Sequence, residues 1–102
     1  MLTIEEIREK ILPICLRYDI DRAYLFGSYA RGEATEDSDV DIRIEKGSNK
    51  NLKSLLQVSG FRLNLEDALQ KKVDLLTVLP QQPLYEIFRN KVLQEEVLIY
   101  ER

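Results

Sequence analysis

Hydrophobic and polar residues recur along the chain with two different periods, which divide it into predicted helices and strands. The first segment, residues 4–18, has a helical period and begins after Thr3, which forms a capping box with Glu6. Pro13 lies inside this segment and removes one backbone donor, so we expect a kink there or a break into two short helices. The apolar face of the segment consists of Ile4, Ile7, Ile11, Ile14, Cys15 and Tyr18.

Two strand-like stretches come next, joined by a motif that contains glycine. Residues 22–26 are mostly apolar, and in residues 39–44 apolar positions alternate with polar ones. Between them we expect a short helix from Ser28 to about Arg31, which Gly32 would terminate. An acidic loop over residues 33–38 then leads into the second strand.

The second half of the chain continues the alternation of helix and strand. A polar turn at residues 47–51 precedes a long helical segment whose apolar positions change side near Gly60. One apolar set is Leu52, Leu55, Leu56 and Leu63, and the other is Val58, Phe61, Leu65, Ala68 and Leu69. Either Gly60 breaks the helix so that both sets enter the core, or one set packs on the sheet and the other is left for a partner. We favour the break, because a glycine stands where the phase slips.

The chain closes with three further predicted elements. A strand is expected over residues 73–79, and Pro83 suits the first turn of a last helix. Residues 97–100 are a short apolar run that would be a terminal strand or a docked tail. The complete order of alternating helices and strands predicts an α/β (α+β) fold, a small mixed sheet with helices packed against it.

Length and composition limit the classes of protein to consider. The 102 residues allow a single domain, 1–102, with a modest core. No stretch approaches the roughly 18 apolar residues of a membrane span, and the first residues are too acidic for a signal peptide, so we expect a cytoplasmic protein without membrane contact. The net charge of -3 argues against broad electrostatic binding of nucleic acid.

The chain contains one cysteine and no histidine. Cys15 cannot form an internal disulfide, and its place on the apolar face predicts a core residue without chemistry. The usual zinc sites and every histidine general base are excluded, so carboxylates must carry any acid–base chemistry.

Residues 27–41 read Gly-Ser-Tyr-Ala-Arg-Gly-Glu-Ala-Thr-Glu-Asp-Ser-Asp-Val-Asp and concentrate the candidate chemistry. Gly27 would let the backbone approach a phosphate closely, and Ser28 offers a hydroxyl and an N–H where a helix begins. Taken alone, these two residues favour a plain tight turn with a capping serine. The two aspartates that follow, Asp39 and Asp41, reverse that preference.

Asp39 and Asp41 lie two residues apart on a predicted strand, roughly 6.5 to 7 Å from each other at the backbone and on one face. Their carboxylates can converge on one hard cation or bridge two, as in-line phosphoryl or nucleotidyl transfer requires. Asp74 is the candidate third donor, because a lone acid in an apolar strand is costly unless it is paired or metal-bound. The structural alternatives are an ion pair of Asp39 with Arg31 or Arg43 and a solvated strand face for Asp41.

Three separated motifs agree in order and spacing with one family. They are Gly-Ser-x-Ala-Arg-Gly, Ser-Asp-x-Asp followed by an apolar residue, and Val-Asp followed by an apolar residue. The chain resembles the nucleotidyltransferase superfamily that includes DNA polymerase beta, and within it the minimal nucleotidyltransferases, small MNT proteins paired with HEPN-domain partners. The resemblance covers nearly the whole chain.

The resemblance implies the nucleotidyltransferase fold and attack of an acceptor hydroxyl on the α-phosphorus of ATP. It implies Mg²⁺, as two ions, held by Asp39, Asp41 and Asp74, with the nucleotide bound by Gly27, Ser28 and Arg31. For Arg31 two roles are equally open, which are neutralising the triphosphate and tying the motif helix to a neighbouring acid.

The resemblance leaves three functions open. Family relatives attach AMP to a tyrosine of a HEPN ribonuclease toxin and so silence it, which would make this chain an antitoxin in a hetero-oligomer. A non-catalytic antitoxin would block the toxin by contact alone. Transfer to a small molecule such as an aminoglycoside is disfavoured, because little of the chain remains to enclose such an acceptor. Candidate docking surfaces are Leu52, Leu55 and Leu56, or residues 97–100.

Overall fold

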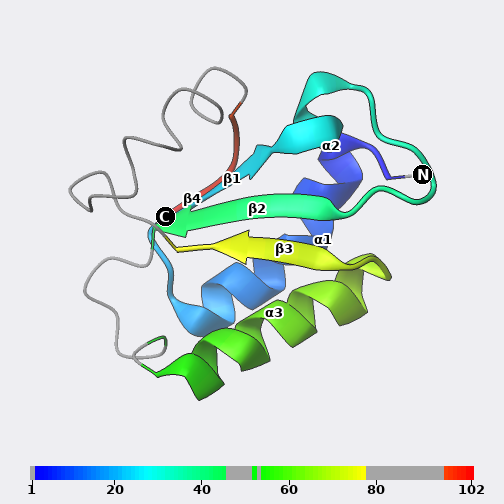
Figure 1. Ribbon diagram of the computed structural model, residues 1–102. Helices are drawn as coiled ribbons and strands as arrows, with labels where there is room; N and C mark the ends of the chain where they lie inside the picture. The colour runs from blue at the N-terminus through cyan, green and yellow to red at the C-terminus, as the bar shows by residue number, and fades with distance from the viewer. Residues whose placement is uncertain (1, 46–51, 53, 78–95) are drawn as a thin grey trace, which may run out of the picture.

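A computed structural model describes residues 2–45, 52, 54–77 and 96–102, and its helices and strands form a small α/β domain (Figure 1). The elements in chain order are α1 (Ile4–Tyr18), β1 (Arg22–Phe26), α2 (Gly27–Arg31), β2 (Val40–Glu45), α3 (Leu55–Leu69), β3 (Val73–Leu76) and β4 (Val97–Glu101). The predicted turn at 47–51 and the predicted helix after Pro83 lie outside the described residues.

The four strands form one mixed sheet in the order β3-β2-β1-β4. Strand β1 is antiparallel to both β2 and β4, whereas β2 and β3 are parallel. The predicted mixed sheet is therefore confirmed, and the terminal run 97–100 is a strand rather than a docked tail. Strand β3 ends at Leu76, so it is shorter than the pattern over residues 73–79 predicted.

Helices α1 and α3 lie beside each other and bury their apolar sides against one face of the sheet. Strand positions that alternate along β1 and β2 point into this core, because side chains two residues apart share a face. Cys15 is fully buried, as predicted, and burial raises the pKa of its thiol to about 12. The core contains Ile7, Ile11, Cys15, Leu25, Val40, Ile42, Ile44, Phe61, Leu65 and Val73, among others.

The opposite face of the sheet carries the polar positions of the same strands. Arg43 of β2 lies over the ring of Tyr24, 4.4 Å from its centroid, and its Nη2 donates to Glu96 at 3.1 Å. The side chains of Arg43 and Glu96 are only 3% and 6% exposed. This ion pair crosses β1 and so connects β2 to the start of β4.

Helix α1 is continuous through Pro13, so the predicted break into two helices is wrong. The predicted capping box between Thr3 and Glu6 is present in both directions. Pro13 and Glu9 are both exposed, which leaves the carbonyl that loses its partner open to water. Hydration at the helix surface explains why the proline is tolerated.

Helix α3 is also continuous, so the favoured break at Gly60 is wrong. Gly60 is instead where α3 approaches α1, since a Cβ there would lie 3.4 Å from the Tyr18 hydroxyl. Asn64 donates at 3.0 Å to both that hydroxyl and the Gly60 carbonyl, and Tyr18 packs edge-on against Phe61. The phase slip marks a helix crossing rather than a helix end.

An unbroken α3 leaves three of the four residues of one apolar set outside the core, close to the second alternative. Leu55 and Leu56 are 87% and 83% exposed, and Leu63 is also exposed. Leu52 precedes the helix and is fully buried, so it is wrong as a docking residue. The run 97–100 is only partly available, because Ile99 and Tyr100 are buried and Leu98 is exposed.

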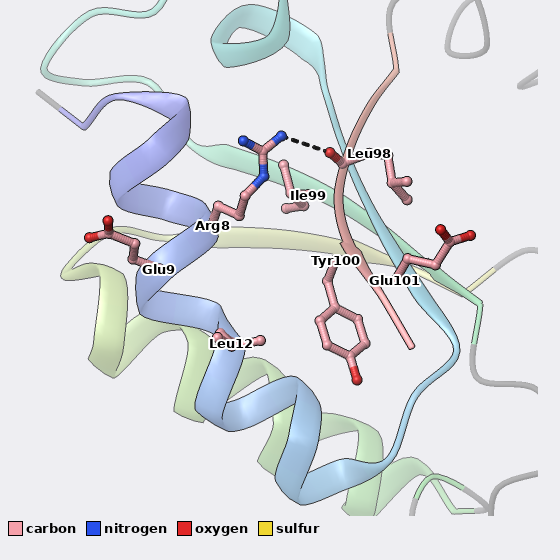
Figure 2. A pocket seen from close by; sticks show the side chains of 7 residues that line it. All are labelled: Arg8, Glu9, Leu12, Leu98, Ile99, Tyr100 and Glu101. Carbon is pink, nitrogen blue, oxygen red and sulfur yellow. Dashed lines mark hydrogen bonds between the residues drawn. The ribbon is translucent and has the colours of Figure 1, made fainter.

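Strand β4 forms one edge of the sheet and lies along α1 (Figure 2). Arg8 of α1 donates from Nη2 to the Leu98 carbonyl at 2.9 Å, which satisfies one backbone acceptor of this edge strand. A groove of about 410 Å³ runs beside this contact, and Leu12 and Tyr100 are among the residues that line it. No helix of the described residues is long and apolar enough to cross a membrane.

Candidate functional site

The turn between β1 and α2 brings backbone against a carboxylate. Gly27 has φ +72°, and a Cβ at this position would lie 2.2 Å from Oδ2 of Asp41. Phe26 is paired with Asp41 across β1 and β2, which explains the close approach. A side chain at position 27 is thus excluded both by backbone conformation and by space. Helix α2 ends at Gly32, also as predicted, with φ +74°.

Ser28 does not cap α2. The N-cap position is Phe26, and no side-chain hydrogen bond caps this helix. The structural alternative of a capping serine is therefore wrong. Ser28 is half-buried in the first turn of α2, next to Gly27, and its role in phosphate binding stays a prediction.

The three predicted carboxylates gather at one end of the polar sheet face. Asp41 and Asp74 are direct neighbours in the parallel register of β2 and β3. Asp39 comes two residues before Asp41, just ahead of β2. Burial raises the pKa of Asp41 above its ordinary value, and the negative charges of Asp74 and Asp39 raise it further, while Arg31 lowers it. The sheet thus holds like charges close together.

Asp74 differs from the sequence-based prediction in one respect. The apolar run predicted a buried strand, but β3 is at the edge of the sheet that the described residues form, and Asp74 is exposed. Asp74 is therefore not a buried carboxylate that needs a cation. What connects Asp74 to the site is its register with Asp41.

The donors at this end of the sheet fit a hard divalent cation. They are all carboxylate oxygens, which Mg²⁺ prefers, and a cation would relieve the repulsion around Asp41. Within residues 2–45, 52, 54–77 and 96–102, no group of three acidic, cysteine or histidine side chains is placed so that it could hold a metal ion. Binding of such an ion by Asp39, Asp41 and Asp74 stays a prediction.

Arg31, at the end of α2, reaches two acids. Its Nε donates to Oε1 of Glu33 at 2.9 Å, and its charge lowers the pKa of Asp41. The alternative in which Arg31 ties the motif helix to a neighbouring acid thus agrees with the structure. Its side chain remains substantially exposed, so nucleotide binding by Arg31 stays a prediction.

The turn between α3 and β3 contributes contacts to the site that sequence reasoning missed. The Val40 N–H donates to the Lys72 carbonyl at 2.9 Å, and Lys71 donates to the Glu36 carbonyl in the loop before Asp39. Oε2 of Glu66 accepts from the Val73 N–H at 2.9 Å. A glutamate in the last turn of a helix is electrostatically unfavourable, and this is the sequence signal that could have drawn attention to Glu66.

Comparison with known proteins gives the class of this fold and site. Residues 9–102 match the family described as Polymerase beta, Nucleotidyltransferase. The class is that of nucleotide-transferring enzymes. Because the match spans nearly the whole chain, this chain belongs to the polymerase beta nucleotidyltransferase family, and it resembles the minimal, MNT-type members.

Two relatives show the likeness in sequence. A protein of Methanocaldococcus jannaschii, provisionally named as a protein adenylyltransferase, is 43% identical over 96 residues, covering 94% of this chain and 97% of the relative. The protein adenylyltransferase MntA of Thermococcus cleftensis is 42% identical over 81 residues, covering 74% of this chain and 78% of MntA.

Two solved structures show the likeness in fold. A structure described as a minimal nucleotidyltransferase is 31% identical, with a TM-score of 0.67 over 94% of this chain and 95% of that one. A chain of a toxin–antitoxin crystal structure with AMP-PNP has a TM-score of 0.73, covering 93% of this chain and 73% of its own length. At 21% identity, this second likeness concerns the fold alone.

Proposed function

We propose that this chain is a Mg²⁺-dependent protein adenylyltransferase that transfers AMP from ATP to a tyrosine of a HEPN-type toxin and so acts as an antitoxin. The observation that carries the proposal is the register of Asp41 with Asp74, with Asp39 two residues away, beside the glycine turn at Gly27. Two carboxylates on adjacent strands and a third at the strand entrance supply the oxygen donors that this reaction requires.

The residues of the chain have separate roles in the proposed reaction. The backbone at Gly27 and the hydroxyl of Ser28 hold the β- and γ-phosphates, because the missing side chain lets phosphate oxygens approach the first turn of α2. Asp39, Asp41 and Asp74 would hold Mg²⁺, which would neutralise charge on the leaving pyrophosphate. Arg31, exposed beside Asp41, contributes a further positive charge towards the nucleotide.

The chemical step is a displacement at phosphorus. The acceptor oxygen forms a bond to the α-phosphorus, the bond from that phosphorus to the bridging oxygen breaks, and pyrophosphate leaves with the bonding electrons. The acceptor hydroxyl loses its proton. Asp74 is exposed at the open edge of the sheet, where its carboxylate can meet an incoming hydroxyl and accept that proton.

A macromolecular acceptor suits the shape of the site. Asp39 and Asp74 are both exposed, so their carboxylates lie at the surface of the described structure. A small acceptor needs a concave site that buries most of its surface, whereas a protein supplies its own surface. The sequence likeness to proteins named as protein adenylyltransferases supports the same choice.

The test is incubation of the purified chain with labelled ATP, Mg²⁺ and the HEPN-type protein encoded beside it, followed by mass spectrometry of both proteins. We expect added AMP on a tyrosine of the HEPN-type protein, and none when Mg²⁺ is chelated. A stable complex without added mass would support an antitoxin that acts by binding alone. Efficient transfer to an aminoglycoside, without modification of the protein, would overturn the protein acceptor.

A further inference from the structure

The turn between α3 and β3 makes hydrogen bonds to both segments that carry the predicted acidic ligands. It consists of Gln70, Lys71 and Lys72, and it contacts the β2 side through two bonds. The Lys72 carbonyl accepts from the Val40 N–H at 2.9 Å, directly between Asp39 and Asp41 in the chain. Lys71 donates to the Glu36 carbonyl, three residues before Asp39.

The same turn is held on the β3 side by Glu66. Oε2 of Glu66 accepts from the Val73 N–H at 2.9 Å in a partly buried contact, and Val73 immediately precedes Asp74. The Glu66 carbonyl also accepts from the Gln70 N–H at 2.8 Å, where α3 ends with Gln70 at φ +54°. Glu66 therefore fixes both the end of the helix and the start of the strand.

Strand β3 needs such a contact more than the other strands. It has four residues, and among the described strands it lies at the edge of the sheet and pairs only with β2. A shift of one residue would turn Asp74 to the opposite face, because strand side chains alternate. The N–H of Val73 is the first backbone donor of β3, so its partner determines where the strand begins.

The position of Glu66 in the last turn of α3 is electrostatically unfavourable. A negative charge in the last turn of a helix opposes the helix dipole, and the last turn of α3 contains no basic residue. Asp67 carries the same charge at the next position, but only its backbone carbonyl joins the turn, as acceptor from Gln70. Of these two acids, Glu66 alone has a side-chain contact with β3 among the described residues.

We propose that Glu66 is a positioning residue for the nucleotidyl transfer, which acts through the Val73 N–H to hold Asp74 in register with Asp41. This inference rests on the proposed function. Loss of the Glu66 contact leaves the three carboxylates in the chain and changes only the placement of Asp74. Misplacement by about 1 Å can lower a catalytic rate by up to about 100-fold.

The test compares Glu66→Ala, Glu66→Gln and Asp67→Ala with the unaltered chain, using the HEPN-type protein and ATP at saturating Mg²⁺. We expect Glu66→Ala to lower kcat about tenfold or more with a smaller change in KM for ATP. Glu66→Gln keeps an oxygen that accepts from the Val73 N–H, so it should retain most of the rate. Asp67→Ala removes an equal charge without touching β3 and should behave as the unaltered chain.

A second measurement does not depend on activity. Hydrogen exchange of the Val73 amide should be faster in Glu66→Ala than in Glu66→Gln, with the β1 amides unchanged in both. An unaltered kcat in Glu66→Ala, or an equal loss of kcat in Glu66→Gln, would overturn the positioning role. Failure of the unaltered chain to transfer AMP would instead contradict the proposed function, while the exchange result would still report on the contact.

Discussion

The polar face of the sheet has two charged regions. In one region acids and arginines form ion pairs, and in the other region acids gather without such pairs among the described residues. In the ion-paired cluster, Arg22 and Arg43 contact Glu45, Glu96 and Glu101, so each acid has an arginine partner. In the acidic cluster, Asp39, Asp41 and Asp74 make no ion pair with any described residue, and their mutual repulsion contributes to the raised pKa of Asp41. The two clusters share β2, where Asp41 and Arg43 are two residues apart.

The charges of the ion-paired cluster stabilise the fold, whereas those of the acidic cluster are the ones proposed to bind a ligand. A buried charge without a partner is destabilising, so the compensation of Glu96 by Arg43 is what the fold itself requires. Among the described residues, no ion pair compensates the three aspartates at one end of the sheet, although the charge of Arg31 lowers the pKa of Asp41. The proposed cation and nucleotide would give that arrangement a physical reason. Five predictions test the comparison, from the largest expected effect to the smallest.

The largest effect should come from removing charge in the acidic cluster. Asp39→Asn combined with Asp41→Asn should lower nucleotide transfer on the order of 10³-fold or more, because amides keep the shape and lose the charge that holds Mg²⁺. Thermal melting should show a folded protein that Mg²⁺-ATP no longer stabilises. The matched control is Glu101→Gln in the ion-paired cluster, which should transfer normally. Wild-type transfer by the double variant would mean that the aspartates are structural.

Breaking the ion-paired cluster should affect stability. Arg43→Met leaves Glu96 buried without its partner and should lower the free energy of unfolding by about 3 kcal/mol or more. Urea titration measures this loss. Adding Glu96→Leu to Arg43→Met should restore much of the stability, because an apolar pair replaces the ion pair. A single variant as stable as wild type would remove the contrast between the two clusters.

The two glycines of the motif separate backbone strain from a clash with the site. Gly27→Ala places a Cβ 2.2 Å from Oδ2 of Asp41 and should reduce transfer on the order of 10²-fold by displacing this carboxylate. Gly32→Ala has a similar φ of +74° but no atom within 4 Å of its Cβ. It should cost about 1–2 kcal/mol of stability and leave transfer unchanged. Equal effects of the two variants on kcat would contradict a site at Gly27.

Removing the Ser28 hydroxyl tests the phosphate side of the site. Ser28→Ala should weaken binding of a non-hydrolysable ATP analogue by about 0.5 to 1.5 kcal/mol, the contribution of one hydrogen bond. Stability should hardly change, because this hydroxyl does not cap α2. Calorimetric titration measures the binding. An unchanged dissociation constant would exclude Ser28 from the nucleotide site.

The smallest effect is a gain in stability from Asp41→Asn without Mg²⁺. The pKa of Asp41 is raised in the folded state, so the folded chain binds this proton more tightly than the unfolded chain, and ionisation destabilises the fold. Near neutral pH the variant should be more stable by less than about 1 kcal/mol, because solvent screens a half-exposed group. The difference should shrink as the pH falls through the pKa of Asp41. A variant less stable than wild type at neutral pH would contradict repulsion in the acidic cluster.

Local patterns predicted much of the fold. The capping box at Thr3, the strand over residues 22–26 and the helix end at Gly32 are all present, because each depends on residues close in the sequence. The predictions that failed depend on distant neighbours. Gly60 lies inside α3 because Tyr18 of α1 packs there, and Asp74 is exposed because β3 is at the edge of the sheet.

The sequence by itself determined which residues are the candidates for the chemistry of this protein. Gly27, Asp39 and Asp41 follow from a glycine turn and a period of two, which are local properties of the backbone. Only the tertiary structure decided that Asp74 stands beside Asp41 and that Glu66 holds the start of β3. Strand order and register depend on packing between segments more than 30 residues apart in the chain, and no local period encodes that packing.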